Sequence, residues 1–129
     1  MQNQKTILII EDEKSLREAL MDILHLKNFS TIEAKNGREG LELAVDKHPD
    51  LILLDIIMPE MDGMTTLKKI REESGAWGKN VAIIILTNLT ATDEQPILDA
   101  VENKLTHYLI KSDWKLHDIV KKIEDILKI

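Results

Sequence analysis

The sequence has no cysteine, and it has only three prolines, five glycines and four aromatic residues (one Phe, one Tyr and two Trp) in 129 residues. The absence of cysteine excludes disulfides, zinc–thiolate sites and cysteine nucleophiles. Its apolar runs are far too short to span a bilayer, and the polar stretch from Met1 to Lys5 is no signal-peptide core. These absences predict a cytoplasmic protein without a membrane partner.

Positive charge is also in deficit, because 17 Lys and Arg residues face 23 Asp and Glu residues, for a net charge of −6. This balance argues against a nucleic acid as a direct partner. Neither a P-loop nor a G-x-G-x-x-G motif is present, so nucleotide binding has no support. With 43% hydrophobic and 31% charged residues, we expect residues 1–129 to form one folded domain.

Short apolar runs predict the strands of a buried sheet. The runs are 7–10, 51–54, 81–86 and 108–110, and the first three are apolar throughout. Continuous apolar runs of this length are typical of parallel strands that helices cover on both faces. A fifth segment, 29–34, alternates apolar and polar residues, which suits a strand at the edge of the sheet.

Helical periodicity separates these strands. The apolar positions that mark the helices are 16, 19, 20, 23 and 24, then 41, 44 and 45, which are expected to point inward, then 64, 67 and 70, then 116, 119, 120, 123 and 127. Asn36 is a predicted cap of the second helix, which ends before Pro49. Thr92 and Gln95 have capping-box spacing for a fourth helix, and Ser112 or Asp113 is the expected cap of the last.

Strands that alternate with helices predict an α/β fold with right-handed crossovers and a doubly wound parallel sheet. The segment 75–78 is expected to be a loop before the fourth strand. The four histidines show no metal-binding spacing and are expected at the surface or in loops.

Polar residues follow four of the predicted strands directly. Glu11 and Asp12 follow the first, Asp55 the third, Thr87 the fourth and Lys111 the fifth. Ligands of open parallel sheets bind outside the carboxyl ends of the strands, so these side chains are expected to share one site.

Three carboxylates at one site repel one another unless a cation offsets their charge. Mg²⁺ suits this role, since it prefers oxygen ligands and binds through one or two carboxylates plus a phosphate. These carboxylates and the metal, together with the ammonium of Lys111 and the hydroxyl of Thr87, are the groups that suit the transfer of a phosphoryl group. Asp55 stands alone on its strand and is the best candidate for a nucleophile that forms an aspartyl phosphate.

Competing chemistries fit less well. Glu11 and Asp55 could form the acid/base pair of a glycosidase, but the sequence offers no aromatic platform for a sugar. A phosphatase of the haloacid-dehalogenase kind carries a second Asp two residues after its nucleophile, and Ile57 occupies that position.

The chain resembles the receiver domain of two-component response regulators, the CheY-like family. The resemblance covers residues 5 to 128. It rests on I-I-E-D-E at 9–13, L-D-I-I-M-P-E-M-D-G at 54–63, L-T at 86–87 and Y-L-I-K at 108–111. It implies a flavodoxin-like (βα)5 fold with five parallel strands in the order 2-1-3-4-5.

The resemblance also implies a role for each acidic residue. Asp55 corresponds to the phospho-accepting residue, and Asp12 to the acid that ligates Mg²⁺ directly. Glu11 corresponds to the neighbour that acts through a metal-bound water. The backbone carbonyl of Ile57 corresponds to a further ligand.

Other positions correspond to the switch. Thr87 matches the hydroxyl that turns toward the phosphoryl group, Lys111 the cation that pairs with its oxygens, and Tyr108 the aromatic residue whose rotamer follows Thr87. Pro59 and Gly63 match residues that shape the loop after the phospho-accepting residue.

Three departures from the family pattern lie on the output side. Asn88 replaces a small residue and could narrow access for the phosphodonor. Ser112 replaces a proline that often follows a cis bond, and a cis bond at Ser112 costs several kcal/mol. Lys104 and Leu105 replace Gly-Ala. These changes bear on partner choice more than on phosphorylation.

The expected function is a signalling domain that takes a phosphoryl group from a histidine kinase or phosphotransfer protein onto Asp55 and switches its output surface. It is not an enzyme beyond catalysing its own phosphorylation and dephosphorylation. A homodimer through the fourth helix, fifth strand and fifth helix is a further expectation. The alternative is a receiver-like interaction module that phosphorylation does not control.

Overall fold

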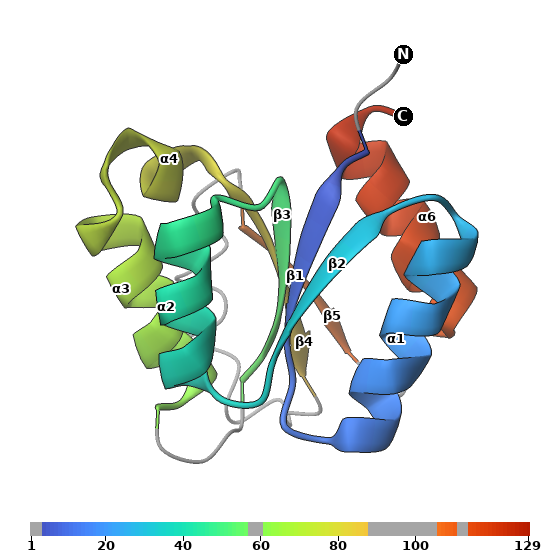
Figure 1. Cartoon of the computed structure of the whole chain (residues 1–129), viewed down its shortest axis with the longest axis horizontal. Helices are drawn as coiled ribbons and strands as arrows, with labels where there is room; N and C mark the ends of the chain where they lie inside the picture. The colour runs from blue at the N-terminus through green and yellow to red at the C-terminus, as the bar shows by residue number, and fades with distance from the viewer. Residues whose placement is uncertain (1–3, 57–60, 88–105, 111–113) are drawn as a thin grey trace.

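The computed structural model describes residues 4–56, 61–87, 106–110 and 114–129 (Figure 1). The elements are β1 Thr6–Ile10, α1 Lys14–Leu26, β2 Ser30–Ala34, α2 Gly37–Lys47, β3 Leu51–Asp55, α3 Gly63–Glu73, α4 Gly75–Asn80, β4 Ala82–Thr87, β5 Thr106–Ile110 and α6 Leu116–Leu127. The fourth helix predicted from Thr92 and Gln95 lies outside the described residues. No helix in the described ranges is both long and apolar enough to cross a membrane.

All five strands run parallel in the order β2-β1-β3-β4-β5, as predicted. The weakly alternating strand β2 lies at the edge, and only one of its residues is fully buried. By contrast, all five residues of β3 are buried between its two neighbours. The hydrophobic pattern therefore follows the position of each strand in the sheet.

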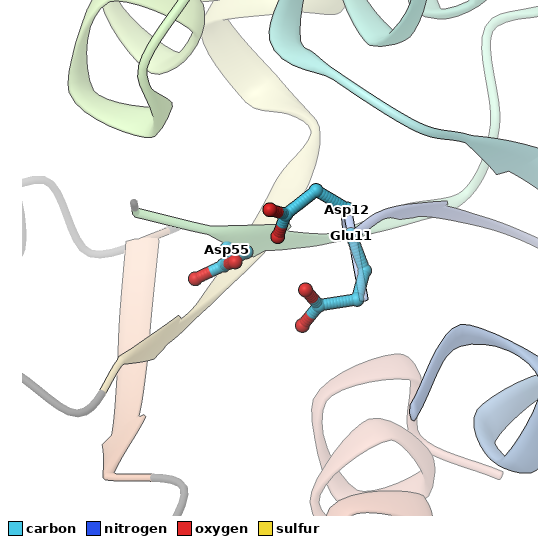
Figure 2. Close-up of side chains that lie close together, drawn as sticks. All are labelled: Glu11, Asp12 and Asp55. Atoms are coloured by element: carbon cyan, nitrogen blue, oxygen red, sulfur yellow. The ribbon is translucent and has the colours of Figure 1, made fainter. Parts of the chain in front are cut away.

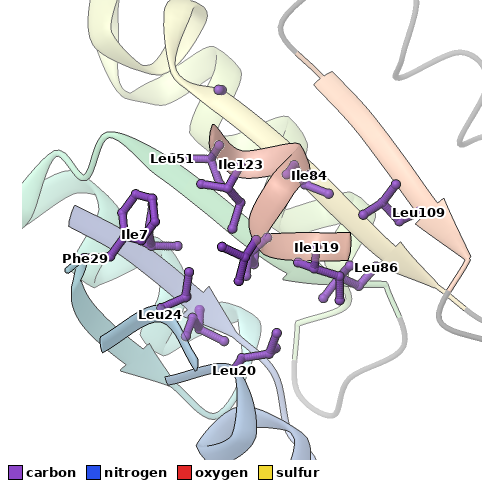
Figure 3. Packing of buried hydrophobic residues seen from close by; sticks show 14 residues of the cluster. Ile7, Leu20, Leu24, Phe29, Leu51, Ile84, Leu86, Leu109, Ile119 and Ile123 are labelled. Carbon is purple, nitrogen blue, oxygen red and sulfur yellow. The ribbon is translucent and has the colours of Figure 1, made fainter. Parts of the chain in front are cut away.

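Side chains of the inner strands β1, β3 and β4 alternate between two cores, one on each face of the sheet. Ile7, Ile9 and Leu53 belong to the core that α1 and α6 cover (Figure 3). Leu8 and Leu54 belong to the core that α2 and α3 cover. In Figure 1 these helix pairs lie on opposite sides of the sheet, which confirms the doubly wound architecture.

Helix α2 begins as predicted, because the Asn36 side chain accepts a hydrogen bond from the Glu39 backbone N–H at 2.8 Å. Its inward face consists of Gly37, Gly40 and Ala44, which are buried. The prediction that Val45 points inward is wrong, since this side chain is 46% exposed. Position 45 is one residue beyond the buried stripe and is thus turned about 100° away from it.

The predicted loop at 75–78 is wrong, because Gly75–Asn80 forms the short helix α4. The Trp77 ring stacks on His48 with centroids 4.4 Å apart, and its Nε1 donates to the Pro49 carbonyl at 3.3 Å. A Cβ at Gly78 would collide with the Ile70 carbonyl of α3. Tertiary packing therefore supports a helix that its two glycines disfavour.

Helix α6 carries its predicted apolar stripe, with Ile119, Val120 and Ile123 buried. The predicted cap at Ser112 or Asp113 is wrong, because the residue that precedes the first helical turn is Lys115. Its backbone N–H donates to the Asp118 carboxylate at 3.0 Å, which satisfies one polar group of the helix start.

The histidine prediction holds for three of the four side chains. Those of positions 25, 48 and 117 are exposed, but His107 lies within β5 and is half-buried. Because His107 is a half-buried strand residue, the prediction that all four histidines lie at the surface or in loops is wrong for this one.

Candidate functional site

The order of the strands places the two acidic segments side by side. Strands β1 and β3 pair in parallel, and the register joins Ile10 to Leu54. The next residue on each strand is an acid, Glu11 after β1 and Asp55 at the end of β3. Two acidic positions 44 residues apart in the sequence therefore leave the sheet together.

Glu11, Asp12 and Asp55 form one cluster at this edge of the sheet (Figure 2). Each residue offers a carboxylate oxygen, and these oxygens all lie within 4.8 Å of one another. Glu11 is 1% exposed and Asp55 is 6% exposed, whereas Asp12 faces solvent. Two carboxylates thus sit in a shielded position, and the third is open to solvent.

This donor set fits a hard divalent cation. Carboxylate oxygens are the ligands that Mg²⁺ takes, and a cation offsets the mutual repulsion of three like charges held this close together. The exposed side of the cluster leaves room for the water molecules and phosphate oxygens that Mg²⁺ keeps in its coordination shell.

Main-chain contacts fix the turn that carries Glu11. Its N–H donates to the Ala34 carbonyl at 3.0 Å, and its own carbonyl accepts from Arg17 at 2.9 Å. Its carboxylate accepts from the Glu13 N–H at 3.1 Å. Arg17 is absent from the predicted site because it is charged, although its spacing of three residues from Leu20 places it on a buried face of α1.

The start of α3 closes against the end of β3. The Gly63 N–H donates to the Ile56 carbonyl at 2.8 Å, and a Cβ at Gly63 would collide with the Asp55 carbonyl. Only glycine allows this close approach. The Asp62 side chain caps α3 by accepting from the Thr65 N–H at 2.8 Å, so the first turn of α3 is held against the end of β3.

Two of the remaining predicted positions, Thr87 and Tyr108, lie on β4 and β5. Asp55 pairs with Leu86, so Thr87 at the end of β4 comes one residue further along the same edge, and Thr87 pairs in turn with Ile110. Tyr108 of β5 is half-buried and packs against the core of α2 and α3. Ile57, Pro59, Asn88, Lys104, Lys111 and Ser112 lie outside the described residues.

The response regulator receiver domain family matches residues 7–124 of the chain. The chain belongs to this family. As a receiver domain it is 35% identical over 127 residues to the nitrate/nitrite response regulator protein NarL of Escherichia coli strain K12, covering 95% of this chain and 56% of that protein. It is 33% identical over 123 residues to a protein-glutamate methylesterase/protein-glutamine glutaminase of Archaeoglobus fulgidus, covering 95% and 34%.

Among solved structures, a two-component response regulator from Clostridium difficile superimposes on this receiver with a TM-score of 0.83 at 32% identity, covering 97% of both chains. The receiver thus matches 97% of the length of that chain. It spans only 56% of the Escherichia coli relative and 34% of the Archaeoglobus fulgidus relative. It is a phospho-accepting signalling domain of the two-component type. The activities named for the longer relatives are not assigned to this chain.

Proposed function

We propose that Asp55 accepts the phosphoryl group of this receiver. The observation that carries the proposal is the shielded Asp55 carboxylate beside Glu11 and Asp12, with all three within 4.8 Å. A carboxylate oxygen of Asp55 bonds to phosphorus while the bond from phosphorus to the donor's leaving group breaks, and the leaving group keeps that electron pair. The product is an acyl phosphate on Asp55.

Asp12, Asp55 and the backbone carbonyl of Ile57 are the proposed ligands of Mg²⁺, and Glu11 is proposed to act through a metal-bound water. When bound, the cation offsets the negative charge that gathers on the phosphoryl oxygens during transfer. Asp12 faces solvent and so meets both the cation and the phosphodonor first.

Thr87 and Lys111 are proposed to bind the phosphoryl oxygens through a hydroxyl and an ammonium group. Their support is their position, since β4 ends at Thr87 beside Asp55, and Lys111 directly follows β5. Tyr108 is proposed as the switch aromatic, because it lies on β5 next to β4 and is only half-buried.

The proposed donor is a histidine kinase or phosphotransfer protein in the cytoplasm. The receiver, proposed to be a single domain over residues 1–129, then catalyses its own phosphorylation and dephosphorylation. Its proposed output surface consists of the predicted fourth helix with β5 and α6, which is also the surface proposed for a homodimer.

Labelling with acetyl phosphate tests the proposal. Intact-mass spectrometry is expected to show one added phosphoryl group in the presence of MgCl₂ and none after chelation of the metal. Asp55→Ala is expected to abolish labelling, whereas Asp50→Ala, at the opposite edge of the sheet, is expected to retain it.

Labelling that survives in Asp55→Ala would place the acceptor elsewhere. If the wild-type chain is folded by circular dichroism but is not labelled under any condition, it is instead an interaction module that phosphorylation does not control.

A further inference from the structure

A buried cation contacts the main chain of the turn that carries Glu11. Arg17 of α1 is 6% exposed, and its guanidinium donates to the Glu11 carbonyl at 2.9 Å. Its Nε lies 3.8 Å from a carboxylate oxygen of Glu33, which is itself 46% exposed. Burying a guanidinium is costly unless polar groups accept its protons, and here one acceptor is the main chain of the acidic turn.

The Arg17 contact fixes the peptide that joins Glu11 to Asp12. Because a peptide unit is planar, the direction of the Glu11 carbonyl sets the orientation of the plane from which Asp12 departs. The Glu11 N–H is already held by the Ala34 carbonyl of β2 at 3.0 Å. With both its polar backbone groups held, Glu11 has little freedom to rotate and Asp12 begins from a fixed direction.

We infer that Arg17 is a positioning residue of the metal site. It aims the Asp12 carboxylate toward Glu11 and Asp55 through the Glu11 carbonyl, and it touches neither cation nor phosphoryl group. The inference rests on the proposed function, since it assigns Arg17 to the site that Asp12 and Asp55 form.

A positioning role and a purely structural role predict different results. If Arg17 only stabilises the fold, its loss lowers stability and leaves the Mg²⁺ affinity of the folded protein unchanged. If it aims Asp12, its loss weakens Mg²⁺ binding in protein that is fully folded. Outer partners of metal ligands are worth about tenfold or more in affinity.

Arg71 offers a matched control. Its guanidinium also donates to main-chain carbonyls, those of Gly78 at 3.0 Å and Val81 at 2.6 Å, but these lie around α4 and the start of β4. Arg17→Gln and Arg71→Gln therefore remove the same group and the same kind of contact at opposite edges of the sheet.

The experiment is a titration of ¹⁵N-labelled protein with MgCl₂, followed through the backbone amides of residues 11–13. Far-UV circular dichroism first establishes that each variant is folded at the temperature used. Arg17→Gln is expected to raise the Mg²⁺ dissociation constant about tenfold, whereas Arg71→Gln is expected to stay within about twofold of wild type. Both variants are expected to unfold at lower urea concentration than wild type.

Arg17→Lys keeps the positive charge with one ammonium in place of the planar fork. It is expected to bind Mg²⁺ more tightly than Arg17→Gln and about threefold more weakly than wild type. If Arg17→Gln does not fold, this variant decides the question. A dissociation constant within about twofold of wild type would then overturn the inference.

Failure of the inference and failure of the proposed function give different patterns. Wild type that binds Mg²⁺ together with a folded Arg17→Gln that binds equally well overturns the role of Arg17 alone. Wild type whose amides do not respond to MgCl₂ overturns the metal site, and the role of Arg17 with it.

Discussion

The two edges of the sheet use polar side chains in opposite ways. At the amino-terminal edge, polar groups are satisfied by the main chain. The Asp50 carboxylate accepts from the Thr6 N–H at 2.7 Å, and Arg71 donates to the Val81 carbonyl at 2.6 Å. Partial burial lowers the pKa of Arg71 to about 10.

At the carboxyl-terminal edge, by contrast, three side chains of like charge are brought together. Glu11, Asp12 and Asp55 place their carboxylate oxygens within 4.8 Å of one another, and two of the three are buried. Such an arrangement disfavours the folded state until a cation arrives. The comparison teaches that the first edge stabilises the fold, whereas the second holds charge ready for a ligand.

The largest effect is expected on Mg²⁺ affinity. Asp12→Asn should raise the Mg²⁺ dissociation constant about 100-fold, and Glu11→Gln about tenfold, because a direct ligand contributes more than a group that acts through water. Asp50→Asn, at the other edge, should leave it unchanged. The amide titration described above measures all three, and an unchanged constant in Asp12→Asn would contradict the metal site.

Stability without Mg²⁺ should change in opposite directions at the two edges. Asp55→Asn is expected to raise the free energy of unfolding by about 1 kcal/mol, because it removes one of three mutually repelling charges. Asp50→Ala is expected to lower it by about 1 kcal/mol, because the Thr6 N–H loses its acceptor. Urea unfolding measures both. If both variants changed the free energy of unfolding in the same direction, the contrast between the two edges would be wrong.

The tryptophans report on the two edges separately. Trp114 is 38% exposed and lies three residues after Lys111, whereas Trp77 stacks on His48 at the far edge. Addition of Mg²⁺ and beryllofluoride should change the fluorescence, Trp114→Phe should abolish most of that change, and Trp77→Phe should preserve it. The reverse pattern would locate the moving surface at the amino-terminal edge.

The smallest effect is expected from His107. Partial burial and the nearby charge of Lys122 lower its pKa below the ordinary value of 6.5. The folded state therefore favours neutral His107, and its contribution to stability is lost as the pH falls below about 6.5. His107→Gln should reduce the loss of stability between about pH 7.5 and about pH 5.5. A pH dependence as steep as that of wild type, measured by urea unfolding, would refute this.

The helix at Gly75–Asn80 could not be predicted from the sequence. Its two glycines and its short length indicate a loop, and local propensity gives no reason for another assignment. The helix exists because Trp77 packs on His48 and because Gly78 fits against the Ile70 carbonyl. Both partners are distant enough in the sequence that no periodic pattern connects them.

Arg17 shows the same limit at the site. The sequence places Glu11, Asp12 and Asp55 at strand ends, so their convergence follows from parallel strands and could be predicted. The contact between the Arg17 guanidinium and the Glu11 carbonyl depends on how α1 packs on the sheet. The spacing of Arg17 from Leu20 and Leu24 places it on the buried face of α1, but that spacing does not tell which acceptor its guanidinium meets.

By itself, the sequence determined which segments are buried, where each strand ends and which edge collects the acids, because these follow from local periodicity and from the geometry of parallel strands. Asn36 as a helix cap belongs to the same class, since the backbone N–H from which its side chain accepts is only three residues away. Only the packing of segments against one another decides that Val45 stays exposed, that α4 folds and that Arg17 donates to the Glu11 carbonyl. These outcomes depend on contacts between segments that meet only after the helices have packed on the sheet.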